Sequence, residues 1–357
     1  METGGIGSFE LVHWIWPPVL VATAAWLWHR SRRRLTRWRK VAAGAALSLT
    51  ALIGLGGTYE SIGAAVDLRR YEAPGALVEL ADGRRMHLNC SGSGAPTVVL
   101  EALSGGASPG WGWIQRGLSE QVRVCSYDRP GRGWSDPVSE PQDAREIAGQ
   151  LAELLDRAQE PGPYVLVGHS LGGLYARMFA DRYPERVAGM VLLDAAHPEQ
   201  FERQEGAEDE HESYRSFQKS FAPMARLGIW RLYFDLGGTF DFGGLPPVER
   251  GQLKAIWSSP ALFHSQRYEN DAVRSVHRQV RPLGAAGDFP LMVITAGEQP
   301  EDWLELQEEM TELSPNATQR VIEGATHVSL IFDRQDAAQV TRGVLDVWRS
   351  ANGSGPL

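Results

Sequence analysis

The chain has 357 residues, 43% of them hydrophobic and 22% charged, which excludes a disordered or collagen-like protein and allows a sizeable core. The formal net charge of −9 argues against nucleic acid as a partner. The charge is unevenly distributed, because residues 1–40 contain seven Lys or Arg and two Asp or Glu, a balance of +5 that leaves −14 for the remainder. Such an asymmetry indicates a membrane-associated segment or a charged tail.

Two stretches near the N-terminus, 11–28 and 41–59, contain no Asp, Glu, Lys or Arg. Each is close to the roughly 20 apolar residues that cross a bilayer. All seven basic residues lie between them, in 29–40, and short basic loops stay on the cytoplasmic side of a membrane. We therefore predict a membrane anchor of two transmembrane helices over residues 1–60, with the lipid bilayer as a partner and the rest of the chain on the extracytoplasmic side.

Three other interpretations of this region stay open. The second stretch could be a signal peptide cleaved near Ala64-Ala65, although the apolar segment upstream argues against it. The first stretch could lie in the membrane interface, which leaves one span and the same side for the rest of the chain. The basic run could bind nucleic acid, but its hydrophobic flanks argue against that.

Strand-like and helical segments alternate after a predicted linker at 61–75. The predicted strands are Ala76–Ala81, Arg85–Cys90, Thr97–Leu100, Gln121–Tyr127, Tyr164–Val167, Val187–Leu193, Pro290–Thr295 and Thr318–Ile322. The predicted helices are Ala144–Ala158, Leu171–Arg182, Trp303–Leu313 and Ala337–Ser350. This alternation predicts an α/β fold with a mostly parallel sheet that helices cover on both faces.

Residues 198–288 interrupt the alternation and are rich in aromatic side chains. We predict that they form an inserted, largely helical cap. The core then consists of 76–197 and 289–350, followed by a tail at 351–357.

One motif carries chemistry. Gly168-His169-Ser170-Leu171-Gly172 follows a predicted buried strand and begins a predicted helix. This is the G-x-S-x-G nucleophile elbow, in which glycines permit a tight turn that exposes the serine hydroxyl. The helix N-terminus behind the serine favours the negative charge that develops during attack. Ser170 is therefore the candidate nucleophile.

With this motif in this context, the chain resembles the α/β-hydrolase superfamily over roughly 76–350, and most of all its serine esterase, lipase and aminopeptidase branch. The resemblance implies an eight-stranded, mostly parallel sheet with an inserted cap. Epoxide hydrolases and haloalkane dehalogenases are similar but have Asp at the elbow. The resemblance also implies that His327, which follows the last predicted strand in Gly324-Ala325-Thr326-His327, is the catalytic base.

The catalytic acid stays open among three residues. Most of the superfamily places it after the strand that precedes the histidine, often three residues past a glycine, but Pro300 occupies that position here. Asp302 and Glu301 follow it and could instead begin a helix, where acidic residues serve as caps. Asp194 ends the strand after the nucleophile helix, a position that haloalkane dehalogenases and some lipases use. We favour Asp194, then Asp302, then Glu301.

The resemblance places the oxyanion hole at the backbone N–H groups of Leu171 and Ser104, with Leu103 as the alternative to Ser104. Residues 128–135 resemble the superfamily's D-x-x-G-x-G-x-S turn, and we expect a structural role for them. We expect no metal or organic cofactor, since the sequence has no C-x-x-C, H-E-x-x-H or P-loop pattern.

Together these features predict a membrane-anchored serine hydrolase that cleaves a small-molecule carboxylic ester through an acyl-enzyme. The aromatic cap favours an apolar substrate. One alternative is an aminopeptidase of the proline-iminopeptidase type, although its usual elbow, Gly-Gly-Ser-Trp-Gly, differs from the one here. The other is a catalytically silent relative that binds a ligand. No pattern indicates an oligomeric state.

The chain has two cysteines, Cys90 and Cys125. They fall on strands that the superfamily places side by side. A disulfide is permitted if this domain is extracytoplasmic, and two buried free thiols are the alternative. The sequence favours neither.

Overall fold

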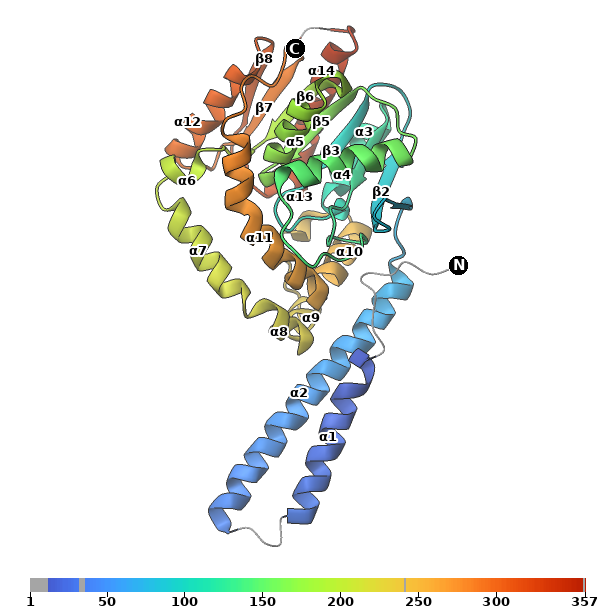
Figure 1. Cartoon of the computed structure of the whole chain (residues 1–357), viewed down its shortest axis with the longest axis vertical. Coiled ribbons are helices and arrows are strands. Elements are labelled where there is room, and N and C mark those ends of the chain that lie inside the picture. Colours follow the sequence, from blue (N-terminus) through green and yellow to red (C-terminus); the bar gives the residue numbers. More distant parts are fainter. Residues whose placement is uncertain (1–11, 32–35, 241, 356) are drawn as a thin grey trace.

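The computed structural model describes residues 12–31, 36–240, 242–355 and 357. It consists of a helical hairpin and a globular α/β part (Figure 1). The hairpin is formed by α1 (Val12–Ser31) and α2 (Arg37–Arg70), which lie against each other. A β-carbon at Gly54 of α2 would overlap the side chain of Val21, so this glycine is needed for the close approach of the two helices.

The helix α2 is longer than the sequence predicts. The predicted linker at 61–75 is helical as far as Arg70, so α2 continues through most of it. Among the described residues, α2 alone is long and apolar enough to cross a membrane by length and composition, and only 11% of its apolar window is buried. The predicted span 11–28 is helical from Val12 but does not meet that criterion, so the double span stays a prediction.

An eight-stranded sheet forms the centre of the globular part, in the order β1-β2-β4-β3-β5-β6-β7-β8. The strands are β1 (Ala76–Glu79), β2 (Arg85–Ser91), β3 (Thr97–Glu101), β4 (Val124–Tyr127), β5 (Tyr164–His169), β6 (Val187–Leu193), β7 (Leu291–Ala296) and β8 (Ala317–Ile322). Strand β2 runs in the opposite direction to the other seven, so the β1–β2 and β2–β4 pairs are antiparallel and the remaining pairs are parallel. The predicted fold class is confirmed, and each predicted strand is present with ends that differ by a few residues.

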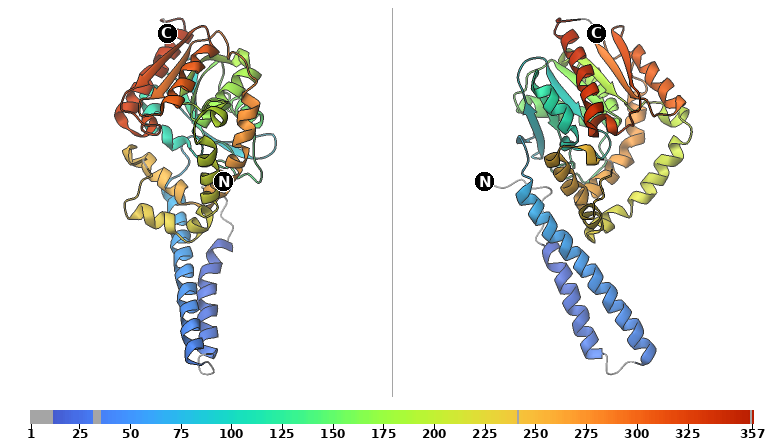
Figure 2. Two further views of the ribbon diagram at one scale, coloured as in Figure 1. Left: turned by 90° about the vertical axis from the view of Figure 1, so that its left-hand side faces the viewer. Right: turned by 180° about the vertical axis from the view of Figure 1, so that it is seen from behind.

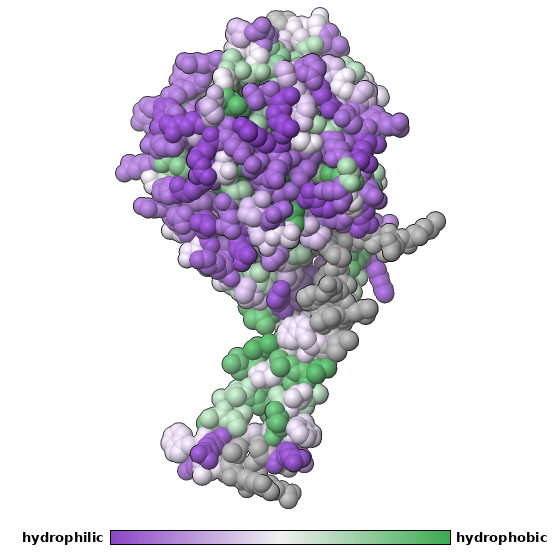
Figure 3. Space-filling view, viewed as in Figure 1, coloured by the Kyte–Doolittle hydropathy of each residue, from purple (hydrophilic) through white to green (hydrophobic). Residues whose placement is uncertain are grey.

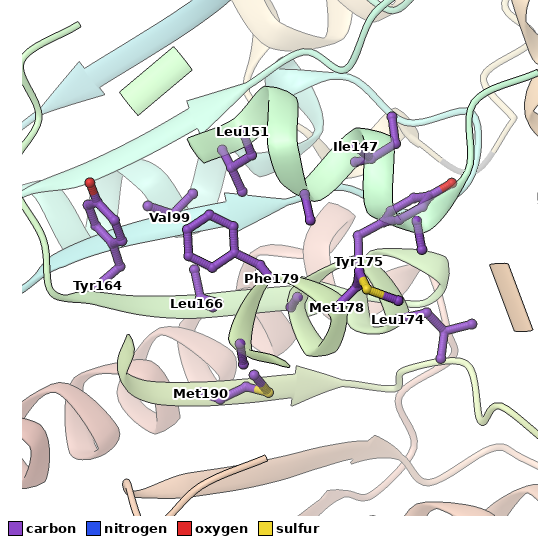
Figure 4. Packing of buried hydrophobic residues seen from close by; sticks show 14 of the residues in the cluster. Val99, Ile147, Leu151, Tyr164, Leu166, Leu174, Tyr175, Met178, Phe179 and Met190 are labelled. Carbon is purple, nitrogen blue, oxygen red and sulfur yellow. The ribbon is translucent and has the colours of Figure 1, made fainter. Parts of the chain in front are cut away.

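Helices cover both faces of the sheet. They are α3 (Gly112–Ser119), α4 (Ala144–Arg157), α5 (Leu171–Arg182), α12 (Glu301–Glu309), α13 (Ser329–Phe332) and α14 (Arg334–Ala351). On one face, α4 and α5 bury Leu151 and Phe179 against Leu166 of β5 (Figure 4). On the other face, α3 and α14 bury Ile114 and Val344. The strands are apolar on both sides because each side packs against helices.

The predicted cap is helical throughout its regular structure. It contains α6 (Gln200–Arg203), α7 (Ala207–Gln218), α8 (Phe221–Arg226), α9 (Ile229–Asp235), α10 (Pro247–Ser258) and α11 (Pro260–Val280). Many of its aromatic side chains pack on one another: Trp230 contacts Phe221, Phe240 and Phe263, with ring centroids 5.0–5.9 Å apart. Most of these aromatics therefore form the cap's own core.

A disulfide joins β2 to β4. Cys90 and Cys125 are register partners in the antiparallel pair, and their Cα atoms are 4.0 Å apart. The alternative of two free thiols is thereby excluded.

Candidate active site

Ser170 lies at the turn between β5 and α5. Its φ of 56° and ψ of −126° form a conformation that a residue with a side chain rarely adopts, and its N–H donates to the carbonyl of Leu193 at 3.1 Å. A β-carbon at Gly168 would lie 2.6 Å from the carbonyl oxygen of Gly172. The glycines of the motif are therefore required by backbone crowding, as the sequence predicts for a nucleophile elbow.

Asp194 and His327 form a short hydrogen bond. Nδ1 of His327 donates to Oδ2 of Asp194 at 2.6 Å, so Nε2 is free of that proton and can accept one. Trp303 Nε1 donates to Oδ1 at 2.9 Å, and Gln299 Nε2 donates to Oδ2 at 2.6 Å. Burial alone would raise the pKa of Asp194, but its contacts with His327, Trp303 and Gln299 outweigh burial and lower the pKa. The carboxylate therefore stays ionised.

The two alternative acids are engaged elsewhere. Asp302 accepts from the backbone N–H groups of Glu205 at 2.9 Å and Trp303 at 2.8 Å, which ties the start of α12 to the cap. Glu301 is exposed in the first turn of α12. The structure therefore brings Asp194, and neither Asp302 nor Glu301, to the imidazole of His327.

His169 supports His327 in a way that the sequence did not reveal. Its Nε2 donates to the backbone carbonyl of His327 at 3.0 Å, and the two rings lie 4.6 Å apart between centroids. Burial, with a smaller contribution from His327, lowers the pKa of His169 to about 3. A neutral His169 thus positions the histidine loop. Its place beside Ser170 was the only available signal.

Arg129 determines the orientation of the loop that follows β3. Its guanidinium donates to the carbonyl oxygens of Ala102 at 2.7 Å and Leu103 at 2.8 Å. The C=O and N–H of a trans peptide point in opposite directions, so the N–H of Ser104 points away from Arg129. Ser104 and Leu171 line the same cavity as Ser170 and His327, whereas Leu103 lines a second cavity.

A buried charge cluster connects this loop to the cap. Glu269 of α11 binds Arg129 at 2.7 Å and Arg132 at 2.8 Å, and it accepts from the Ser104 hydroxyl and the Gly105 N–H at 2.7 Å each. Burial alone would raise the pKa of Glu269, but Arg132 and Arg129 outweigh it and lower the pKa to about 2. Residues 128–135 thus form a turn and also contribute Arg129 and Arg132, which bind Glu269 beside the loop that follows β3.

Two cavities flank these residues. The first, of about 370 Å³, is lined by Ser170, His327 and mainly polar cap residues. Those cap residues include Gln204, Glu210, His211, Asn270 and His277. The second, of about 100 Å³, is apolar and lies behind Leu103 and Val328, the chain neighbours of Ser104 and His327. Trp111, Phe240, Trp257 and Phe332 also line it.

One group of possible metal ligands lies within the described ranges: Cys90, Cys125 and Glu160. The two sulfur atoms are bonded to each other, so neither is available as a thiolate ligand. This group therefore does not fit a metal ion.

Comparison with known proteins identifies similar chains. The sequence model described as the alpha/beta hydrolase family matches residues 90–341. An uncharacterized protein of Schizosaccharomyces pombe is 26% identical over 342 residues, which cover 81% of this chain and 59% of that protein. The chain thus spans about three fifths of that relative's length.

Two further similarities are shorter or structural. An uncharacterized vacuolar membrane protein of Saccharomyces cerevisiae is 37% identical over 90 residues, covering 24% of this chain and 14% of that protein. An esterase from Exiguobacterium antarcticum superposes with a TM-score of 0.60 at 19% identity, covering 77% of this chain and 100% of the esterase. At that identity the esterase shows a shared fold alone.

Proposed function

The chain belongs to the alpha/beta hydrolase family, and from this premise we propose that it is a serine hydrolase that cleaves carboxylic esters. Ser170 is the nucleophile, His327 the general base and Asp194 the acid that orients the imidazole. One observation carries the proposal. His327 donates a 2.6 Å hydrogen bond to Asp194, and it lines the same cavity as Ser170, a serine on a strained elbow.

The proposed reaction has two acyl-transfer steps. His327 Nε2 takes the proton from Ser170 Oγ as that oxygen attacks the ester carbonyl carbon. The tetrahedral intermediate collapses, the C–O bond to the alcohol breaks, and His327 gives its proton to the departing alkoxide. Water then loses a proton to His327 as its oxygen attacks the acyl carbonyl carbon. The bond from that carbon to Ser170 Oγ breaks and His327 returns its proton to Oγ, which releases the carboxylic acid and restores Ser170.

The backbone N–H groups of Leu171 and Ser104 are the proposed oxyanion donors. The Leu171 N–H is the first in α5, where a helix offers no internal acceptor. The Ser104 N–H is aimed away from Arg129, as described above. Two fixed donors stabilise the oxyanion because they need no reorganisation when its charge develops.

The two cavities favour an ester with an apolar acyl group and a more polar remainder. The apolar cavity of about 100 Å³ lies directly behind the loops that carry Ser104 and His327, which suits it to a short hydrocarbon chain. The larger cavity is lined by amides, histidines and Glu210. The aromatic content of the cap, which suggested an apolar substrate from sequence, is mostly internal packing.

We also propose that α2 anchors the enzyme in a membrane, with the catalytic part on the extracytoplasmic side. The apolar, exposed α2 and the vacuolar membrane relative support membrane association. Two features support the extracytoplasmic placement of the catalytic part. Basic residues lie at the end of the hairpin far from the globular part, and a disulfide lies within the globular part.

Serine-directed labelling tests the nucleophile. A fluorophosphonate probe should label the detergent-solubilised wild-type chain, and Ser170→Ala should remain unlabelled. Equal labelling of both proteins, or none of either, would contradict the proposal. Aryl esters of graded chain length, compared with prolyl-anilide, then distinguish an esterase from an aminopeptidase.

Substitution of the acid tests the triad. Asp194→Asn should lower kcat by about 10⁴-fold, because the imidazole loses the acceptor that fixes its tautomer. Asp302→Asn is the matched control and should leave kcat nearly unchanged. A large loss in Asp302→Asn with full activity in Asp194→Asn would reverse the assignment.

A further inference from the structure

The short helix α9 has two apolar faces. One packs into the cap through Trp230 and Phe234, which are buried. The other consists of the outward side chains Ile229, Leu232 and Tyr233 together with Leu236, the residue directly after α9; they are 40%, 50%, 40% and 80% exposed. These four positions follow the i, i+3, i+4, i+7 spacing of one helix face. A continuous apolar stripe of this kind is costly in water and indicates a contact surface.

The position of α9 along α2 indicates what this surface meets. At the turn before α9, Gly228 packs against α2, and a β-carbon at Gly56 of α2 would overlap the carbonyl oxygen of Leu227. Gly56 lies only about 22 Å along the helix axis from Val41, at about 1.5 Å per residue. The hydrocarbon layer of a bilayer is about 30 Å thick, so this contact lies at or within its outer edge if α2 enters the membrane at Val41. If α2 is tilted, the distance from Val41 to Gly56 along the membrane normal becomes shorter, which places the contact still further inside the outer edge of the hydrocarbon layer.

Ion pairs fix α9 at this height. Arg231, on the opposite side of α9 from the stripe, binds Glu60 of α2 at 2.9 Å and Asp67 at 2.6 Å. Arg231 and Glu60 are nearly buried. Because these charges are paired, they can lie next to the lipid interface without leaving an uncompensated charge there.

The surroundings of the stripe match an interfacial helix. Apolar surface continues from the hairpin onto the lower end of the globular part (Figure 3). The α7–α8 segment next to it exposes Phe217, Lys219 and Arg226. A short apolar face flanked by aromatic and basic side chains is typical of segments that lie in the headgroup layer.

We propose that the outward face of α9 is a second membrane contact, which lies in the interfacial layer of the bilayer that α2 crosses. This inference rests on the proposed membrane anchorage. It also places lipid next to the apolar cavity of the active site: Tyr233 of the stripe stacks on Phe240 with ring centroids 4.9 Å apart, and Phe240 lines that cavity. The surface therefore fits esters that are dissolved in the bilayer.

A quenching experiment on the full chain tests the contact. Both native cysteines are in the disulfide, so Leu236→Cys supplies one free thiol for an environment-sensitive NBD fluorophore. The matched control is Glu185→Cys, an exposed residue just before the amino end of β6, far from the cap (Figure 1). In phosphatidylcholine vesicles that contain doxyl-labelled lipid, the probe at position 236 should be quenched several-fold more than the probe at 185.

The outcomes distinguish this contact from the proposals on which it depends. A chain that floats with vesicles but shows equal quenching at 236 and 185 contradicts the α9 contact and leaves the anchorage intact. Blue-shifted emission at 236 without lipid quenching indicates a protein partner or a second copy, and also contradicts it. A chain that fails to float contradicts both proposals. Quenching does not require turnover, so loss of the hydrolase proposal would not alter this readout.

Discussion

Arg129 and Glu269 influence the proposed oxyanion site without lining its cavity. Arg129 holds the Leu103 carbonyl, and Glu269 holds the Ser104 hydroxyl, the Gly105 N–H and Arg129 itself. The direction of the Ser104 N–H therefore depends on a carboxylate that the cap contributes. Both residues are positioning residues, since neither touches the reacting atoms.

Glu269→Gln should lower kcat by roughly 10-fold while KM changes little, because a misaligned oxyanion donor loses part of the 10²–10³-fold that such donors supply. Glu249→Gln, which weakens an ion pair with Arg116 away from the cavity, is the control and should keep its kcat. Steady-state kinetics on a short aryl ester, below the melting temperatures of both variants, measure this. If the loss of kcat in Glu269→Gln is no larger than the loss of folded protein, Glu269 has a purely structural role.

The sequence predicted the site residues whose signals are local. Ser170, Leu171 and the glycines form one contiguous motif, so their placement follows from a single turn. The choice of Asp194 over Asp302 depends on the pairing of β6 with β7, which no local pattern encodes. The contact between Arg129 and Glu269 joins residues 140 positions apart, and it became visible only in the fold.

At the level of elements, the sequence predicted the strands and the core helices α4, α5, α12 and α14. It described the cap only as largely helical, without the bounds of α11 or its other helices, and it missed α3, α13 and the last turns of α2. The C-terminal part of α2 contains charged residues that argue against a membrane helix and, from sequence, against its continuation. In the structure this part is helical, and its Glu60 and Asp67 pair with Arg231 of the cap, a partner on a distant element.

Arg231→Met should destabilise the globular part by about 3 kcal/mol, since it leaves Glu60 buried without its cation. Arg157→Met, which breaks an exposed ion pair with Glu153 one helical turn away, should cost less than about 0.5 kcal/mol. Thermal unfolding in detergent compares the two variants. Equal effects would show that the contact between α2 and α9 contributes little to stability.

The helix α11 should make stability depend on pH through His277. Burial, with smaller effects of His211 and His197, lowers the pKa of His277 to about 4, below the 6.5 of an unfolded chain. The folded state therefore resists protonation of His277. The contribution of neutral His277 to stability is fully present above pH 6.5 and is lost as the pH falls towards 4.

Between pH 7.5 and 5 this group should cost the wild type about 2 kcal/mol. The free energy of unfolding of His277→Leu should fall by about 2 kcal/mol less than that of the wild type between these two pH values. Chemical denaturation at pH 7.5 and at pH 5 measures this. Burial also lowers the pKa values of His169 and His197, which add their own losses over this interval to both proteins, so the difference between wild type and variant reports His277. Glu269 acts in the same direction only below about pH 4.5. An identical loss in wild type and variant would contradict the neutral, buried state of His277.

For the whole molecule, the hairpin and the disulfide are consistent with one topology. Four basic residues at the end of α1 and the start of α2, Arg30, Arg37, Arg39 and Lys40, lie at the end of the hairpin far from the globular part (Figure 2). Cys90 and Cys125 are bonded within the globular part. The charge asymmetry of the sequence predicted the basic end of the hairpin. The disulfide depended on the register of β2 and β4, since spacing alone does not say whether two strand residues face each other.

The disulfide closes a loop with a sequence separation of 35. Its removal in Cys90→Ala/Cys125→Ala should lower the free energy of unfolding by about 3–4 kcal/mol, mainly through the entropy of the unfolded chain. Reductant should destabilise the wild type by a similar amount and leave the double variant unaffected. A wild type that alkylates two thiols without reduction would contradict the bridge.

The single helix α2 continues without a break from its apolar segment to the body of the enzyme, and Arg231 clamps it there. In a membrane, the proposed nucleophile Ser170 would thus be held at one fixed height, because α2 leaves no flexible linker on which the globular part could move away from the bilayer. Hydrolysis then becomes a two-dimensional process confined to the enzyme's own bilayer. Its rate would follow the mole fraction of ester among the surrounding lipids, and dilution of the bulk suspension would leave it unchanged.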